Sequence, residues 1–330
     1  MSAKPDPYGR DAGWVQIAHR VINESARDNL SLVAASCAFY ALFAAFPALS
    51  ALIALYGLAT DPAAVERHFD ILSYVLPPAA YEAVIDQIKR LAGASSRSLG
   101  WGLAIGLCLA LWSIANLVQT LFAALNIAYE ETERRSTVRF YLSAFGFALL
   151  GIASGTLMLL AIVYVPFIFA YAGYSSAFEA VVRIARWPLL ALLVLFVLAL
   201  LYRYGPCRRS AKWRWVSVGS VFATAAWLAA SAGFSFYVTH VANYDKTYGS
   251  LGAAIVLLFW LYLSFYIVLL GAEINAELEL QTAEDTTRGD PRPMGKRGAF
   301  VADHVAGGKY DAGHPQSEVA GHPERAKAGG

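Results

Sequence analysis

Six stretches of the chain contain no Asp, Glu, Lys or Arg, and five of them are 26 residues or longer. A helix needs roughly 20 mostly apolar residues to cross a bilayer core that is about 30 Å thick. The pattern therefore predicts an all-α fold, a polytopic membrane helix bundle with six transmembrane helices. The charge-free stretches are residues 29–60, 98–129, 140–178, 187–202, 215–244 and 247–272.

The fourth stretch is the shortest, because its 16 uncharged residues cover only about 24 Å at about 1.5 Å per residue. Arg186 and Arg203 flank it, and long basic side chains can reach the membrane interface from the ends of a span. We therefore expect the crossing to extend over about residues 183–203.

Amphipathic helices are expected beside the spans. Trp14, Ile17 and Val21 recur at helical spacing within residues 14–27, which favours an interfacial helix on the membrane surface. Packing of this helix against the bundle is the alternative. The loop 61–97 is the largest polar connection, and it is expected to hold short helices on the outer side of the membrane.

The composition agrees with a membrane protein, and the charges predict its orientation. Hydrophobic residues make up 58% of the 330 positions, charged residues 15%, and the mean hydropathy is +0.48. The net charge of +2 is too small to indicate a nucleic-acid partner, so none is expected. With the N-terminus inside, 19 basic residues lie on the inner side and 7 on the outer side. Both termini are therefore predicted to be cytoplasmic.

Three parts of the chain follow from these patterns. Residues 1–30 are expected to form a cytoplasmic N-terminal segment with the amphipathic helix, and residues 31–280 the six-span membrane domain. Residues 281–330 are rich in Gly, Pro, Asp, His and Lys and show no helical period. They are predicted to form a disordered cytoplasmic tail.

The second span carries the clearest polar stripe. Its polar residues fall near one helical face at spacings of three, four and seven, and polar side chains in membrane helices face protein or water. They could line a polar path, or they could form hydrogen bonds between helices. The candidate path-lining residues are Ser113, Asn116, Gln119, Thr120 and Asn126.

Further candidates lie at helix ends and at a helix-breaking residue. Pro47 removes a backbone hydrogen bond within the first span, which either opens a cavity or shapes packing. Tyr244 and Asp245 lie in the short loop before the sixth span, in a tight turn or a lip facing the substrate. Glu273 and Asn275 lie at its inner end.

Glu273 and Glu277 are four residues apart on one helical face. They are interpreted either as a solvated helix end or as a gate or headgroup contact that pairs with Arg139 or Arg203.

Small residues suggest where spans pack closely. Gly151 and Gly155 form a small-xxx-small pair in the third span, and Ala225, Ala229 and Gly233 recur every four residues in the fifth. We expect helix–helix contacts at both places.

The sequence lacks the common motifs of nucleotide-binding proteins, metalloproteases and serine hydrolases. It contains no GxxxxGK[ST] phosphate loop, no HExxH and no GxSxG, and its six histidines are scattered. Cys37, Cys108 and Cys207 lie far apart, with no CxxC and no metal-ligand spacing. We therefore predict no catalytic residues, no metal site and no cofactor, and expect that the protein is not an enzyme.

Several segments in the same order resemble the YihY/virulence factor BrkB family. They are residues 28–47, 112–129, YRYGP at 202–206, and 243–277, which begins NYDKTYG. The resemblance covers about residues 15–280 and implies a bacterial inner-membrane protein with six spans. Members of this family have carried a ribonuclease label. The family often has Ser before its Leu-Phe-Pro motif, where this chain has Ala44 and Ala45, so a role for that hydroxyl does not carry over.

These observations lead to three hypotheses on function. The first is a translocator, not driven by ATP, for a lipid or another envelope amphiphile or small solute, with membrane lipids as partners and a homo-oligomer as one option. The second is a structural or interaction protein that docks partners through the loop 61–97. The third, a membrane-bound ribonuclease, is disfavoured because no ligand set for a hydrolytic metal is visible.

Overall fold

The computed structural model describes residues 14–59, 96–159, 161, 176–240 and 252–305. Seven long helices and one short one account for most of this part of the chain. The loop 61–97, apart from its last two residues, lies outside it, as do Tyr244, Asp245 and residues 306–330. The helices are α1 (Trp14–Arg27), α2 (Leu30–Ala59), α5 (Ser96–Ala128), α6 (Thr137–Leu159), α8 (Ser176–Tyr204), α9 (Trp213–His240), α11 (Gly252–Leu280) and α12 (Phe300–Asp303).

The predicted fold class is confirmed. Five of the described helices, α5, α6, α8, α9 and α11, are each long and apolar enough to cross a membrane. The number is six when α1 and the first half of α2 count as one bent span, with an angle of 62° between them. Asn29 makes this bend with a positive φ of 52°, a conformation that Asn tolerates better than most residues.

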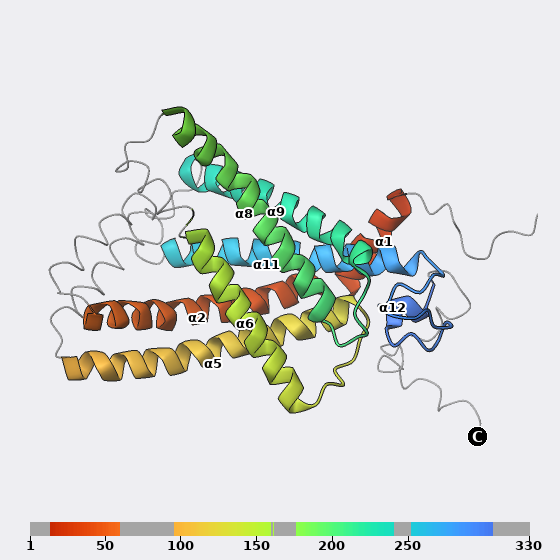
Figure 1. The fold of residues 1–330 in the computed structure, drawn as a ribbon, viewed down its shortest axis with the longest axis horizontal. Coiled ribbons are helices and arrows are strands. Elements are labelled where there is room, and N and C mark those ends of the chain that lie inside the picture. The colour runs from red at the N-terminus through yellow and green to blue at the C-terminus, as the bar shows by residue number, and fades with distance from the viewer. Residues whose placement is uncertain (1–13, 60–95, 160, 162–175, 241–251, 306–330) are drawn as a thin grey trace, which may run out of the picture.

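The helices form a bundle with crossed layers (Figure 1). α2 packs against both α5 and α11, and these three helices run along the long axis of the molecule. α6 and α8 cross them obliquely, and α9 packs between α8 and α11. The fourth span is the helix α8, which continues through both flanking arginines and ends at Tyr204, so the short charge-free stretch is lengthened as expected.

Helices α9 and α11 approach each other closely at two glycines. A methyl group at Gly219 would meet the carbonyl oxygen of Gly271, and one at Gly271 would lie 2.5 Å from the hydroxyl of Tyr202. By contrast, a methyl group at Gly151, Gly155 or Gly233 would meet nothing within 4 Å among the described residues. The contacts predicted at those three glycines are therefore absent from this part of the chain, because their helix faces point away from described neighbours.

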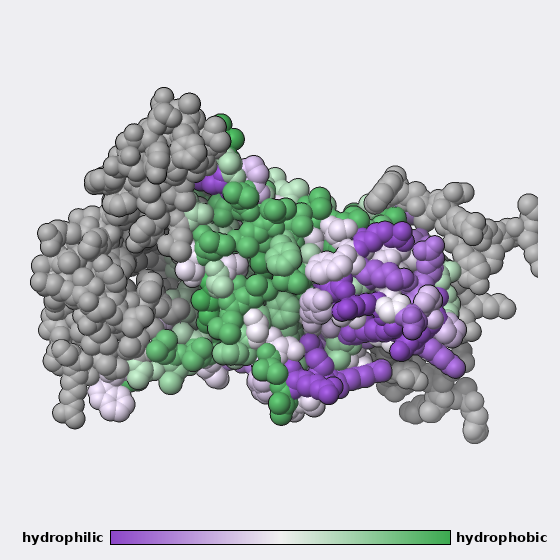
Figure 2. Space-filling model, in the orientation of Figure 1, coloured by the Kyte–Doolittle hydropathy of each residue, from purple (hydrophilic) through white to green (hydrophobic). Residues whose placement is uncertain are grey.

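The surface divides into an apolar belt and a polar end (Figure 2). Large hydrophobic side chains are exposed along the spans, for example Leu142 and Leu192 at 69% and 62%. Hydrophilic residues gather at the end of the molecule that carries α1 and α12. We call this the polar end; it contains residues 126–136, 203–212 and 273–305.

The C-terminal segment, residues 281–305, packs on the polar end, in contrast to the disorder expected from its composition. Ala211 and Thr287 form an antiparallel bridge, and the buried guanidinium of Arg297 donates to four backbone carbonyl oxygens, including those of Ala283 (2.7 Å) and Ala302 (2.6 Å). Order here comes from side chains that bind loop backbone, a device that composition does not reveal.

Helix α1 packs against the bundle, which is the alternative given above to an interfacial helix. Val21 and Ser25 are buried, and a guanidinium nitrogen of Arg20 lies 3.8 Å from a carboxylate oxygen of Glu277 in α11. Ile22 is 66% exposed, so this helix also presents an apolar side chain outward.

Candidate functional site

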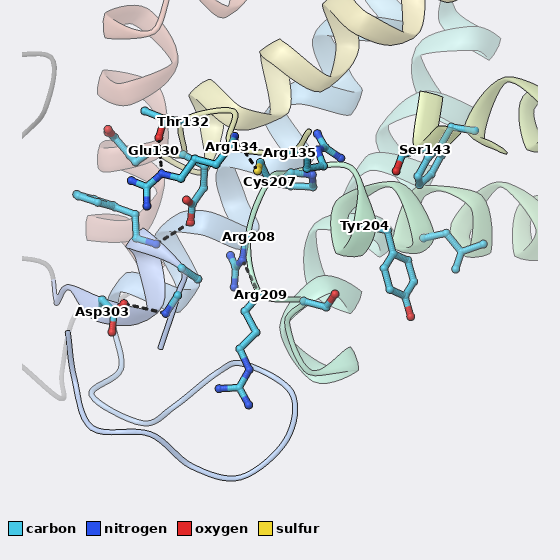
Figure 3. A pocket seen from close by; sticks show the side chains of 18 of the residues that line it. Glu130, Thr132, Arg134, Arg135, Ser143, Tyr204, Cys207, Arg208, Arg209 and Asp303 are labelled. Atoms are coloured by element: carbon cyan, nitrogen blue, oxygen red, sulfur yellow. Dashed lines mark hydrogen bonds between the residues drawn. The ribbon is translucent and has the colours of Figure 1, made fainter. Parts of the chain in front are cut away.

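A pocket of about 840 Å³ opens at the polar end, where four segments distant in sequence meet (Figure 3). Its volume lies within the range of about 300–1,000 Å³ that is usual for small-molecule sites. The loop after α5, the middle of α6, the loop after α8 and the C-terminal segment form its walls. The lining residues that the argument below uses are Glu131, Arg134, Arg135, Gly146, Phe147, Leu150, Leu200, Arg208, Arg209, Phe300 and Asp303.

Asn126 fixes two of these walls relative to each other. Its side-chain oxygen accepts a hydrogen bond from the backbone N–H of Cys207 at 2.7 Å, and its amide nitrogen donates to Glu133 at 3.0 Å. A third link runs from the backbone N–H of Arg134 to the sulfur of Cys207 at 3.2 Å. The last turn of α5 therefore holds the loops 129–136 and 203–212 in register.

Arg135 binds within its own loop and to the next one. Its guanidinium donates to both carboxylate oxygens of Glu133, at 2.8 and 2.7 Å, and to the carbonyl oxygen of Gly205 at 3.1 Å. The cation also lies 4.8 Å from the ring centroid of Phe122. Hydrogen bonds from Arg135 lower the pKa of Glu133 to about 2, so this pair stays ionised at neutral pH.

Arg208 and Glu279 form a fully buried ion pair beneath the pocket. Two nitrogens of Arg208 lie 3.1 and 2.7 Å from the two oxygens of Glu279, and the side chains are 1% and 0% exposed. Thr286 donates to the same carboxylate at 2.7 Å, and the ring of Tyr129 lies 5.1 Å from the cation. The pair therefore joins the loop after α8, the end of α11 and the C-terminal segment at one point.

The C-terminal wall is held by two carboxylates. Glu131 accepts the backbone N–H of Phe300 at 2.7 Å, and Asp303 accepts the backbone N–H groups of Gly295, Arg297 and Gly298 at 2.7, 2.9 and 3.1 Å. Burial raises the pKa of Glu131 to about 7, although the Phe300 hydrogen bond acts in the opposite direction. The contact between Glu131 and this wall thus titrates near neutral pH.

The opposite wall is apolar and belongs to the membrane helices. Gly146, Phe147 and Leu150 of α6 and Leu200 of α8 line it. A methyl group at Gly146 would meet nothing within 4 Å, so open space remains at this end. The pocket therefore joins a polar mouth to an apolar wall at the border of the apolar belt.

A second hollow of about 770 Å³ lies between α1, α2 and α11. It is lined by apolar residues and by uncharged polar groups, among them Ser31 and Tyr262, whose hydroxyl oxygens are 2.8 Å apart. No charged side chain lines it. The arginine-lined pocket offers charged groups that can bind a ligand, and we take it as the candidate site.

The polar stripe predicted in the second span lies on α5, outside both hollows. Asn116 donates to the carbonyl oxygen of Trp112 at 3.0 Å, and Thr120 donates to that of Asn116 at 2.8 Å. Ser113 is fully buried and its hydroxyl has no hydrogen-bond partner among the described residues, while Gln119 is half-buried. Their role in a path stays a prediction.

The other predicted residues are also brought to places outside the pocket. Asn275 is buried between α9 and α11, where it accepts the N–H of Gly219 at 2.7 Å. Pro47 lies inside α2. Glu273 is buried, and one of its carboxylate oxygens has no hydrogen-bond partner.

The interpretation of Glu273 and Glu277 as a solvated helix end is wrong, because they are only 3% and 5% exposed. The cation beside Glu277 is Arg20 of α1, at 3.8 Å, in place of the expected Arg139 or Arg203. Helix α1 packs on α11, and its Arg20 lies beside Glu277.

Sequence reasoning missed the residues that build the pocket. The sequence predicts Arg134, Arg208 and Arg209 only as part of the count of basic residues that sets the orientation, and it predicts a disordered tail where the C-terminal segment forms a wall. The sequence does contain one signal. The loop before α6 and the loop after α8 are both rich in arginine, and arginine favours multidentate contacts with anions.

Metal-ligand clusters were also sought. Within the ranges that the structure describes, no group of three or more His, Cys, Asp or Glu side chains could hold a metal ion. The three cysteines are free thiols, and Cys207 lies beside the pocket with its backbone and sulfur already hydrogen bonded.

Comparison with known proteins identifies relatives over most of the chain. A ribonuclease-like protein, YfkH of Bacillus subtilis, is 35% identical over 235 residues, 64% of this chain and 84% of that protein. UPF0761 membrane proteins of Pseudoalteromonas atlantica and Vibrio atlanticus are 25% and 26% identical over 276 and 271 residues, which are 80% and 81% of this chain and 86% and 83% of theirs. No solved structure matches.

The family expected from the sequence is confirmed by a model of that family. The model named Virulence factor BrkB matches residues 21–295, which include the second half of α1 and the described helices from α2 to α11, whereas α12 lies beyond the match. This membrane protein therefore belongs to the virulence factor BrkB family.

Proposed function

We propose that this protein moves a lipid or another amphiphile or small solute of the bacterial envelope through the inner membrane without ATP. The observation that supports this best is the pocket at the polar end, which has arginines at its mouth and an apolar wall from α6 and α8. An amphiphile needs both environments at once, because its headgroup must stay hydrated or hydrogen bonded while its chains avoid water.

The position of the pocket fits entry from the membrane. Around its apolar wall, α6 and α8 expose large side chains such as Leu142, Leu149 and Phe196 on their outer faces. In a membrane these faces contact lipid chains. A lipid could therefore place its headgroup in the pocket while its chains remain near α6 and α8.

The absence of a phosphate-loop motif from the whole sequence leaves no such nucleotide-binding loop to power transport. Movement down a gradient, or exchange between leaflets, needs no such site. With the polar end on the cytoplasmic side, as the basic residues predict, the pocket would be the cytoplasmic binding position.

Two glycines of the same helix provide the test. Gly146 lines the pocket and Gly151 does not, and a side chain at either position has open space around it. Leu has a higher helix propensity than Gly, so neither Gly146→Leu nor Gly151→Leu should destabilise α6. The assay is the transfer of fluorescent lipids between leaflets of vesicles that contain the full-length protein.

We expect wild type and Gly151→Leu to speed transfer above protein-free vesicles, and Gly146→Leu to lose most of that gain because Leu fills the apolar end. If the wild type gives no transfer for any envelope lipid, the translocator proposal fails. Equal rates for the two variants would remove the pocket from the path.

A further inference from the structure

We propose that the pocket binds the phosphate group of its ligand and that Arg134 and Arg209, which lie on different sides of it (Figure 3), supply the positive charge that attracts this group. The inference deepens the proposed function by naming the headgroup class, a phosphate on an amphiphile. It rests on that function only for the amphiphile, since phosphate binding is measured separately from movement.

Two of the four arginines that line the pocket are already committed to carboxylates. Arg135 pairs with Glu133 at 2.7 Å, and Arg208 pairs with Glu279 at 2.7 Å. These buried or half-buried ion pairs connect the walls of the pocket. Because each pair is neutral overall, it offers little positive charge to attract a ligand.

The other two carry no ion pair with any carboxylate among the described residues. Arg134 uses its Nε to donate to the hydroxyl of Thr132 at 3.1 Å, which leaves its terminal nitrogens for a ligand. Arg209 has a buried Nη1 with no hydrogen-bond partner in the part of the chain that the structure describes. A buried donor without an acceptor costs free energy that an incoming anion would recover.

Arg209 is also held in place by its surroundings. Its backbone N–H donates to the carbonyl oxygen of Gly298 at 2.9 Å. Its guanidinium lies over the loop of the C-terminal segment (Figure 3), where a methyl group on Gly289 would come within 2.7 Å of Nη2. Gly289 has a φ of +96°, so a glycine there permits both the turn and the close approach of the cation.

Two of the three acidic residues that line the pocket already accept hydrogen bonds from the backbone. Asp303 accepts three backbone N–H groups, and Glu131 accepts the N–H of Phe300. An anionic ligand would therefore supply the negative charge that the guanidinium groups of Arg134 and Arg209 lack. Phosphate suits them, because its oxygens accept two parallel N–H bonds from one arginine.

The source of the phosphate is argued from the apolar wall. A soluble phosphate compound would leave Phe147, Leu150 and Leu200 facing water, whereas a phospholipid brings apolar chains to the same side. The expected ligand is therefore a lipid whose headgroup exposes an anionic phosphate.

A matched pair of ligands isolates the phosphate. Phosphatidic acid and diacylglycerol differ only in that group, so each is titrated against the full-length protein in a neutral detergent while tryptophan fluorescence is followed. Glycerol 3-phosphate is the soluble probe. The variant is Arg134→Gln with Arg209→Gln. The control is Arg139→Gln with Arg288→Gln, two exposed arginines that do not line the pocket, one in the first turn of α6 and one in the C-terminal segment.

Hydrogen bonds to a charged group correspond to about tenfold to a hundredfold in affinity each. We expect wild type and the control to prefer phosphatidic acid over diacylglycerol by at least about tenfold, and the pocket variant to lose this preference. A variant with Lys at both pocket positions should retain part of it, because charge remains while the paired N–H geometry is lost. Unfolding temperatures without ligand show whether each variant is folded.

Three results would overturn the inference: no preference for phosphatidic acid in the wild type, a preference that survives in the pocket variant, or an equal loss in the control. Glycerol 3-phosphate binding as tightly as phosphatidic acid would reassign the site to a soluble phosphate compound and reject the lipid. Binding of phosphatidic acid without transfer between leaflets would leave this inference standing and reject the translocator.

Discussion

Two asparagines on one helix behave differently, and the contrast separates the middle of the bundle from its polar end. Asn116 donates to a carbonyl oxygen one turn back in α5, whereas Asn126, ten residues later, binds a loop on each side. Nothing in their residue type distinguishes them. The difference arises because other chain segments end beside Asn126, while Asn116 is surrounded by continuous helices whose backbone is already satisfied.

The same contrast holds for the hydroxyl groups of the spans. Ser220, Thr224 and Ser264 each donate to the carbonyl oxygen four residues earlier in their own helix, at 2.6 to 2.8 Å. At the polar end, Thr286 instead donates to Glu279 across a loop. These three hydroxyl groups therefore donate within their own helix, although Ser264 also accepts from the indole N–H of Trp227, whereas Thr286 links two segments of the polar end.

The largest effect is expected from breaking the ion pair of Arg208 and Glu279. Either Arg208→Ala or Glu279→Ala leaves a buried charge without its partner, which costs about 3–5 kcal/mol of unfolding free energy. Denaturant unfolding in detergent measures this. A double variant, Arg208→Met with Glu279→Leu, should recover much of the loss, and a double variant as unstable as the single ones would show that the pair itself is favourable.

A smaller effect is expected where α9 and α11 touch. Gly219→Leu places a side chain against the backbone of Gly271 and should cost about 1–3 kcal/mol or more through overpacking. Gly233→Leu on the same helix meets open space and is the matched control. Similar unfolding midpoints for the two variants would contradict the close approach of these helices.

The asparagines themselves give the next comparison. Asn126→Leu leaves the N–H of Cys207 and the carboxylate of Glu133 without this partner, so it should cost about 1–3 kcal/mol. Asn116→Leu removes only a bond within its own helix and should change stability by less than about 1 kcal/mol. Both are measured as shifts of the unfolding midpoint. An equal or reversed order would remove the distinction between the two regions.

The smallest effect is a pH dependence at the C-terminal wall. The folded pKa of Glu131 is raised to about 7 by burial, so the folded state binds the proton more tightly than the unfolded state does. The contribution of this group is full below the unfolded value of about 4.5 and is lost as the pH rises through about 7. The unfolding temperature of the wild type, measured relative to that of Glu131→Gln, should therefore fall between pH 5 and about 8. A difference that is flat or grows with pH would contradict it.

The membrane helices could be predicted because each depends on a local property, the length of a charge-free stretch. The pocket could not, because its ties are non-local. Asn126 binds Cys207, which is 81 residues away, and Arg208 binds Glu279, which is 71 residues away. A sequence pattern gives the polar residue but not its partner.

The glycines and the C-terminal segment show two further limits. Gly151 and Gly155 have the spacing of a helix contact, but the close contact with Gly271 is made by Gly219 and Ala223, which have the same spacing, so the spacing alone does not tell which pair is used. The C-terminal segment lacks helical period, yet Arg297 supplies enough hydrogen bonds to its loop carbonyls to order it. Amino-acid composition indicates how much apolar surface a segment can bury, but it does not show how many carbonyl groups one guanidinium group can bind.

The C-terminal wall also fixes when the pocket can exist during synthesis. Residues 298–304 leave the ribosome after all the described membrane helices, so the growing chain inserts these spans while this wall is still missing. A chain shortened before residue 298 would therefore lack one wall of the pocket, and a ligand would meet the arginines of the other walls first.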